Sequence, residues 1–192
     1  MLDFAEWLAT TQWSIALHES LYLYPWIESS HVLFICFFFG TLLFVDLRLT
    51  GKVFTNLSIS QMNKGILPLT ILGFCLMSLT GLLLFYAIPV RNYQNIFFRI
   101  KILLIIIAGL NAFFFHRRMS KEAEKWDKDS FIPNSMKASA IVSLFTWSLV
   151  IISGRMIAYN WFDCDRQPQP EWINFLTSCV VDYQLYEEID GI

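Results

Sequence analysis

The chain has 192 residues, of which 56% are hydrophobic and 18 are phenylalanine, and its formal net charge is −2. This apolar content exceeds what a soluble domain of the same size needs for one core, so the composition excludes an ordinary soluble protein. The near balance of charge excludes a strongly basic surface, and we therefore expect no nucleic acid as a partner.

The first predicted element is an interfacial helix over about residues 6–24. Aromatic and aliphatic residues alternate irregularly with polar ones in this segment. Tryptophan and tyrosine favour the headgroup region of a bilayer, so we expect an amphipathic helix lying on the membrane surface. The residues before it include Asp3 and Glu6 but no Lys or Arg, which differs from the basic start of a cleavable signal peptide, and we expect the N-terminus to be retained.

Four long apolar stretches follow the interfacial segment. A hydrocarbon core of about 30 Å requires about 20 residues of helix, and each stretch approaches or exceeds that length. We therefore predict an all-α fold, an integral membrane four-helix bundle in contact with the lipid bilayer. The predicted spans are residues 26–45, 66–90, 96–115 and 138–159.

The tail over residues 160–192 is predicted to lie outside a single transmembrane domain formed by residues 1–159. Pro168 and Pro170 interrupt any helix that continues from the last span, so we expect a short interfacial segment. Cys164 and Cys179 both fall in this tail. In an oxidising compartment they would form a disulfide, and two unpaired thiols are the alternative.

The basic residues predict the orientation of the chain. Lysine and arginine in short loops stay on the cytoplasmic side of a membrane. The loops after the first and third spans hold most of these residues, whereas the two ends of the chain are acidic. We therefore predict that both termini lie outside, which in a bacterial inner membrane is the periplasm.

Ionisable side chains near the outer ends of the spans are the first candidates for function, because such groups are costly within a membrane. Glu28 and His31 are three residues apart in the first span and share one helix face. Arg99, Lys101 and Arg155 lie near the outer ends of the third and fourth spans. The Glu28 and His31 spacing resembles one half of a di-metal carboxylate site, but the chain has no second half.

These outer residues predict a haem b site. His31 would ligate the iron, and the three cations Arg99, Lys101 and Arg155 would balance the haem propionates. His18 on the surface helix is the best candidate for a second metal ligand, and Met156 is the next. The alternative is a buried ion pair of Glu28 with Arg155 or Arg99 that only fixes the packing of the helices.

Polar residues near the inner ends of the spans are assigned structural roles. Asp46 and Arg48 mark the inner end of the first span, and Asn111 is expected to bridge helices by hydrogen bonding. His116 is expected at the membrane interface. It is separated from His31 by most of a span, about 20 Å or more, and so cannot ligate the same haem.

Four sequence segments resemble a known family. They are YPWIESSHVLFICFFFGTLLFVDLRLTG (24–51), TGLLLF (80–85), FRIKILLIIIAGLNAFFFH (98–116) and SGRMIAY (153–159). They resemble a family of small bacterial four-span inner-membrane proteins of unknown function, which is distantly similar to copper-resistance D and cytochrome-b-like membrane proteins. The resemblance implies a role linked to redox chemistry or metals, and it does not extend beyond about Tyr159.

Three function classes follow from the sequence. The first is an electron-transfer subunit that holds haem b near the outer face and connects a periplasmic redox protein with quinone. The second is a non-catalytic membrane anchor or assembly subunit, and the third is a copper or small-solute carrier, for which the methionines are widely scattered. All three favour a subunit over a stand-alone enzyme, and we expect a homo-oligomer or a larger membrane complex.

Overall fold

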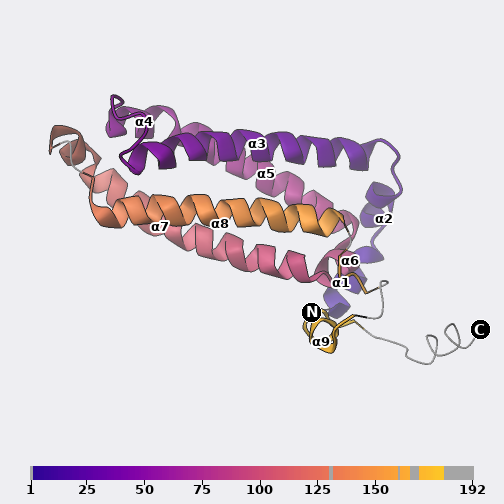
Figure 1. The fold of residues 1–192 in the computed structure, drawn as a ribbon. Coiled ribbons are helices and arrows are strands. Elements are labelled where there is room, and N and C mark those ends of the chain that lie inside the picture. Colours follow the sequence, from indigo (N-terminus) through magenta and orange to yellow (C-terminus); the bar gives the residue numbers. More distant parts are fainter. Residues whose placement is uncertain (1, 130–131, 160, 165–168, 180–192) are drawn as a thin grey trace, which may run out of the picture.

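The computed structural model describes residues 2–129, 132–159, 161–164 and 169–179, and every regular element in these ranges is a helix. Four of the helices are long and apolar enough to cross a membrane, and they pack as a bundle (Figure 1). The predicted fold class is therefore confirmed, and the chain is a multi-pass membrane protein. The four long helices are α3 (Leu23–Leu49), α5 (Leu67–Ala87), α7 (Ile96–Asp129) and α8 (Asn134–Ala158).

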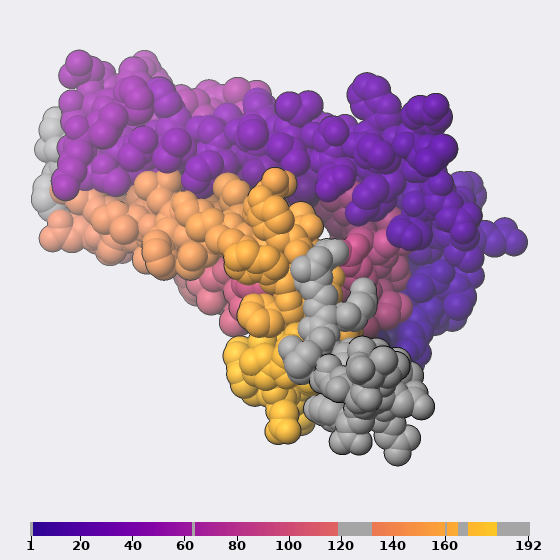
Figure 2. Space-filling model, turned by 45° about the vertical axis from the view of Figure 1, so that its right-hand side comes forward, coloured from indigo at the N-terminus to yellow at the C-terminus, as the bar shows by residue number. Residues whose placement is uncertain are grey.

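The bundle consists of two helix pairs. Helix α3 packs along α5, helix α7 packs along α8, and the contact between α3 and α8 joins the pairs (Figure 1). Figure 2 shows α3 and α8 side by side along one face of the molecule. Side chains that point inward from α3, α5, α7 and α8 therefore approach one another in the interior.

Four short helices gather at one end of the bundle, which we call the cap end (Figure 1). The predicted helix over residues 6–24 is divided into two of them. Thr11 explains the division, because its side chain accepts a hydrogen bond from the Ser14 backbone N–H and so begins a new helix. The cap-end helices are α1 (Leu2–Ala9), α2 (Gln12–His18), α6 (Pro89–Tyr93) and α9 (Glu171–Thr177).

The opposite end, which we call the loop end, carries α4 (Ile59–Gly65) and the connection between α7 and α8 (Figure 1). Ser58 caps α4 by accepting a hydrogen bond from the Gln61 backbone N–H. Helix α7 extends to Asp129, well past the predicted limit at residue 115. The charged segment that follows His116 is rich in Lys, Arg and Glu, which are strong helix formers, and so the helix continues beyond its apolar part.

Proline and glycine set several helix limits. Pro25 lies in the first turn of α3, where the missing N–H is tolerated, so α3 begins three residues earlier than predicted. Gly51 follows α3 with a φ of 75°, a left-handed conformation that suits the residue after a helix. Pro68 lies in the first turn of α5, and Pro89 begins α6 just after α5 ends at Ala87.

Aromatic side chains fill the middle of the bundle. The rings of Phe38 on α3 and Trp147 on α8 meet edge to face, with 4.6 Å between their centroids. Phe74 on α5 contacts both rings. We call these three side chains the aromatic layer. Large apolar side chains on the outward faces of all four long helices are exposed in the isolated chain, as lipid contact requires.

Candidate functional site

The most distinctive polar contact inside the bundle joins His31 to Thr80. His31 lies eight residues into α3, about 12 Å from the start of the helix, and its side chain is half-buried. Its Nδ1 atom is 2.9 Å from the hydroxyl oxygen of Thr80 on α5. The histidine is therefore an interior residue of the cap-end half of the bundle, as the sequence predicted.

The Thr80 hydroxyl determines which nitrogen of His31 carries the proton. Its oxygen is 2.9 Å from the Leu76 carbonyl and 3.1 Å from the Met77 carbonyl, so the hydroxyl proton is directed to the backbone of α5. The Thr80 oxygen must then accept from His31 Nδ1. In the neutral ring this leaves Nε2 with a free lone pair.

Two glycines make room for polar side chains in this region. A Cβ atom on Gly81 would lie 3.2 Å from Cε1 of the His31 ring. A Cβ atom on Gly154 would lie 3.3 Å from the ammonium nitrogen of Lys101. No signal in the sequence indicates this role, because it depends on side chains that other helices bring to the two glycines.

Lys101 is the cation that the structure brings to His31. It lies on α7, its ammonium group packs over Gly154 of α8, and it is close enough to act electrostatically on the His31 ring. Within the described part of the chain, the ammonium group forms no ion pair. His31 and Lys101 therefore form a polar region inside the bundle, to which α3, α5, α7 and α8 all contribute.

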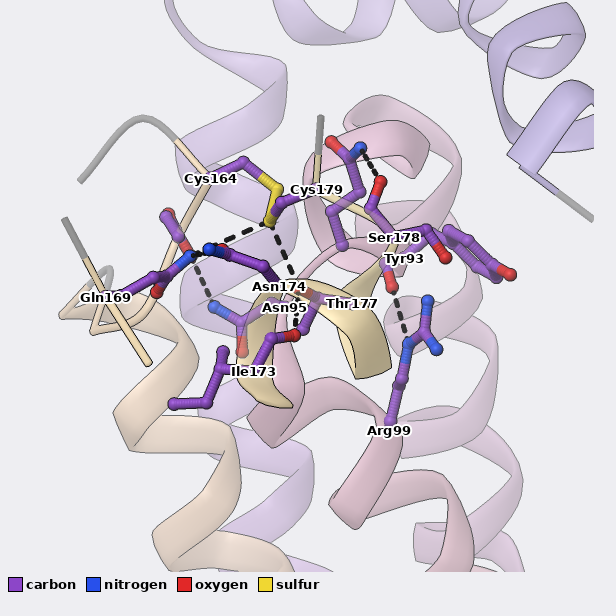
Figure 3. The surroundings of a disulfide bond; sticks show 12 residues. Tyr93, Asn95, Arg99, Cys164, Gln169, Ile173, Asn174, Thr177, Ser178 and Cys179 are labelled. Carbon is purple, nitrogen blue, oxygen red and sulfur yellow. Dashed lines mark hydrogen bonds between the residues drawn. A yellow bond between two sulfur atoms is a disulfide. The ribbon is translucent and has the colours of Figure 1, made fainter. Parts of the chain in front are cut away.

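The two arginines grouped with Lys101 in the sequence are held elsewhere. Arg99 donates from Nε to the Tyr93 carbonyl at 3.1 Å and stacks over the Tyr93 ring (Figure 3). Residues two apart on a helix point in directions about 200° apart, so Arg99 and Lys101 face different sides of α7. Arg155 is exposed and stacks over the Tyr159 ring. One nitrogen of Arg99, Nη2, is buried and has no hydrogen-bond partner.

Neither candidate for a second ligand faces His31. His18 is exposed at the end of α2 and contacts the edge of Tyr24, which precedes His31 by two helical turns, or about 10 Å. Met156 follows Gly154 by two residues on α8, so it points about 200° away from the side that contacts Lys101. The structure therefore brings together His31 and Lys101 but neither His18 nor Met156.

The alternative of a buried ion pair at Glu28 is wrong for this structure. The Glu28 side chain is exposed. Among the described residues it forms no ion pair with Arg99 or Arg155, and the structure shows an ion pair instead between Arg91 and Asp163. In the same part of the chain there is no group of three or more His, Cys, Asp or Glu side chains placed to hold a metal ion.

The predicted structural residues of the loop-end half occupy three different environments. Asn111 on α7 and Ser139 on α8 exchange two hydrogen bonds, from Asn111 Nδ2 to the Ser139 carbonyl and from the Ser139 hydroxyl to Asn111 Oδ1. Arg48 donates to the Leu57 carbonyl at 2.7 Å, and His116 is exposed. Asp46 is the exception, because it is fully buried and one of its oxygens has no partner.

The tail after α8 is closed into a loop by a disulfide between Cys164 and Cys179 (Figure 3). Beside it, Asp163 pairs with Arg91 at 3.2 Å and accepts a hydrogen bond from Asn95. Asn95 also caps α7 by accepting from the backbone N–H of Phe97. The tail therefore shares a polar network with the start of α7. The part of the predicted tail over residues 180–192 lies outside the described residues.

Comparisons of the chain with models of protein families, with curated proteins and with solved structures find no match. The arguments for function therefore rest on the residues of this chain.

Proposed function

We propose that this protein is an electron-transfer subunit that binds one haem b through His31. The observation that carries the proposal is the hydrogen bond from His31 Nδ1 to Thr80, which leaves the Nε2 lone pair free in the bundle interior. Metal-bound histidines generally use this arrangement, because the second ring nitrogen donates to a neighbouring group that fixes the tautomer and the ring orientation. A bound haem would supply one-electron transfer.

Among the described residues, His31 would supply one protein ligand to the iron of a haem. His18 and Met156 are turned away from His31, so His31 is the protein ligand that the described residues offer. A single histidine is sufficient to hold haem in globins and peroxidases. Lys101 beside His31 is suited to a carboxylate that a haem carries.

The charge distribution supports a periplasmic location for the cap end in a bacterial inner membrane. Basic residues at the loop end favour the cytoplasm for that end, which leaves both termini outside. The disulfide at the cap end suits an oxidising compartment. A haem on His31 would then lie within reach of a periplasmic redox protein and of quinone in the outer leaflet. The basic residues concerned are Arg48, Lys52, Lys64, Arg117, Arg118 and Lys137.

The test is an absorption spectrum of the purified protein, oxidised and dithionite-reduced, with a pyridine haemochrome assay. Protein from cells supplied with haem should show a b-type spectrum that His31→Ala abolishes. His116→Ala is the matched control, because this exposed histidine at the loop end should not affect the spectrum. Protein without haem, or a His31→Ala variant that retains it, would contradict the proposal.

A second function, a non-catalytic anchor or assembly subunit, is favoured by the surface of α9. This helix buries Ile173 and Thr177 against the cap end and exposes Trp172 and Phe175, the latter to 85%. The disulfide fixes this apolar side in place. Exposed aromatic side chains on a fixed helix suit the attachment of a partner at the cap end, either a second copy of this chain or a periplasmic protein.

Cross-linking in native membranes, followed by mass spectrometry, tests the anchor function. A specific partner should be linked to α9, and the double substitution Trp172→Ser with Phe175→Ser should remove that link. Phe113→Ser on the lipid-facing side of α7 is a control for general loss of apolar surface. Linkage that is unchanged in the α9 variant would argue against this function, whatever the haem spectrum shows.

A further inference from the structure

A carboxyl group is buried in the loop-end half of the bundle. Asp46 lies on α3, three residues before the last residue of the helix, Leu49, so it is about one turn inside the helix end. Only 3% of its surface is exposed. The buried side chains at this end form an apolar cluster that includes Leu49, Ile59 and Met136. Water is therefore largely excluded from the carboxyl group.

The polar contacts of Asp46 satisfy only part of the carboxyl group. The buried Ser143 side chain on α8 is the polar neighbour of this carboxyl group. The oxygen Oδ2 has no hydrogen-bond partner and is inaccessible to solvent. An ionised carboxylate with one bare oxygen in an apolar region loses hydration that nothing in the protein replaces, which costs several kcal/mol.

Positive charges at the loop end do not compensate for Asp46. Arg48 is directed to the Leu57 carbonyl, and the Lys137 side chain packs over Gly51. Among the described residues none of the basic groups at this end forms an ion pair with Asp46. On the elements at this end the basic residues in the sequence are Arg48 on α3, Lys52 after it, Lys64 on α4, His116, Arg117, Arg118, Lys121, Lys125 and Lys128 on α7, and Lys137 on α8. Helix α5 has no charged residue.

The histidine of the cap-end half is too distant to act as the partner. His31 and Asp46 are fifteen residues apart on α3, which is about 22 Å along the helix axis. Phe38, part of the aromatic layer, lies between them on the same helix. Asp46 is therefore a separate feature of the molecule, and it does not depend on whether His31 binds haem.

The small number of oxygen atoms around Asp46 favours a proton over a metal cation as its ligand. Calcium and magnesium require six or more oxygen ligands at short distance. The described residues supply the Asp46 carboxyl and the Ser143 hydroxyl. A proton on Oδ2 neutralises the charge without further ligands, and the resulting carboxylic acid can still accept a hydrogen bond from the Ser143 hydroxyl.

We propose that Asp46 and Ser143 form a proton-binding site in the loop-end half of the bundle, and that Asp46 carries a proton at neutral pH. The site lies one helical turn from the loop end, so its proton exchanges with the solution on that side of the membrane. Protonation allows α3 and α8 to pack against each other at this level, because it removes the buried charge between them.

Infrared spectroscopy of the full-length protein in lipid nanodiscs at neutral pH tests the proposal. A protonated carboxyl group has a carbonyl band that an ionised carboxylate lacks. The band should disappear in Asp46→Asn, and it should shift to higher frequency in Ser143→Ala because the hydrogen bond is lost. The matched control is Glu28→Gln, an exposed carboxyl on the same helix, which should leave the band unchanged.

If the region of the protonated-carboxyl band is the same in the wild type and in Asp46→Asn, Asp46 is ionised and the proposal is overturned. If the band does not shift in Ser143→Ala, Ser143 does not donate a hydrogen bond to Asp46 and is not part of the proton-binding site. A band that does not shift when H₂O is replaced by D₂O would contradict proton exchange with the loop end. If Asp46→Asn does not fold, the wild type is labelled with dicyclohexylcarbodiimide, which reacts with protonated carboxyl groups in apolar surroundings. Modification at Asp46 supports the proposal. Modification at Glu28 alone overturns it.

Discussion

His31 and Thr80 connect α3 to α5 through one hydrogen bond, with 2.9 Å between the ring Nδ1 and the hydroxyl Oγ1. The bond has two effects. It replaces hydration that the imidazole loses inside the bundle, and it directs the free lone pair of Nε2 into the interior. The threonine thus determines what the histidine can bind.

Substitution of Thr80 tests this relationship. Thr80→Val keeps the shape of the side chain but removes the acceptor for His31 Nδ1, so the tautomer and the ring orientation are no longer fixed. We expect haem affinity to fall about 10–100-fold, as is typical when the hydrogen-bond partner of a metal ligand is lost. Haem titration of the apoprotein measures this change.

Thr70→Val is the matched control for Thr80→Val. Thr70 is also buried on α5, and its hydroxyl bonds only to the Ile66 carbonyl of its own helix. Haem affinity should stay within about twofold of the wild type in this control. Equal losses in both variants would show that the effect comes from α5 and not from the histidine.

The contact between Gly73 and α3 predicts a large effect of one added methyl group. A Cβ atom on Gly73 would lie 2.9 Å from the Phe37 ring and 3.0 Å from the Cα atom of Phe38. Backbone cannot move aside as a flexible side chain can, so Gly73→Ala should force α3 and α5 apart. We expect a loss of about 1–3 kcal/mol in the free energy of unfolding.

Circular dichroism during unfolding in detergent measures the Gly73→Ala effect. Gly40→Ala on α3 is the matched control, because no atom lies within 4 Å of its added Cβ. Alanine favours a helix more than glycine, so the control should be neutral or stabilising by up to about 1 kcal/mol. A Gly73→Ala protein as stable as the control would mean that the two helices are not packed this closely.

The hydrogen bonds between Asn111 and Ser139 predict a measurable coupling between α7 and α8. The Asn111 side chain donates to the Ser139 backbone carbonyl at 3.1 Å and accepts from the Ser139 hydroxyl at 2.7 Å, and only the second bond is lost in Ser139→Ala. A double-mutant cycle with Asn111→Ala and Ser139→Ala should give a coupling energy of about 0.6–1.7 kcal/mol, the range found for hydrogen bonds between membrane helices. Additive effects of the two substitutions would contradict the paired geometry.

Loss of the disulfide should loosen the loop of the tail that contains α9. The bond closes a segment of 15 residues, and crosslinks of this length stabilise a fold by about 3 kcal/mol. The variant Cys164→Ser with Cys179→Ser should therefore be cleaved by chymotrypsin at Trp172 and Phe175 of α9 much faster than the wild type. Cys36→Ser with Cys75→Ser, which removes the two free cysteines of the spans, should not change cleavage.

The four spans could be predicted from the sequence because the length and apolarity of a membrane helix are constrained by the bilayer alone. Helix limits were less predictable. The break between α1 and α2 depends on the Thr11 cap, a short pattern within a segment that otherwise has helical spacing. The extension of α7 to Asp129 follows local helix preference and not hydropathy, so a prediction based on apolar residues ended too early.

The candidate site was only partly predictable. His31 and Lys101 stand out in the sequence because charged and polar groups are rare in spans. Their grouping with Arg99 and Arg155 ignored the direction of each side chain around its helix, which separates Arg99 from Lys101 by about 200°. Thr80 could not be identified in advance, because its partner lies 49 residues away in the sequence and on another helix.

The aromatic layer of Phe38, Phe74 and Trp147 has a consequence for how the two polar regions communicate. The three rings form a low-dielectric partition between His31 and Asp46, and a partition of this kind does not conduct hydrated ions. The two regions should therefore respond to substitution independently, as is usual for sites more than about 10 Å apart.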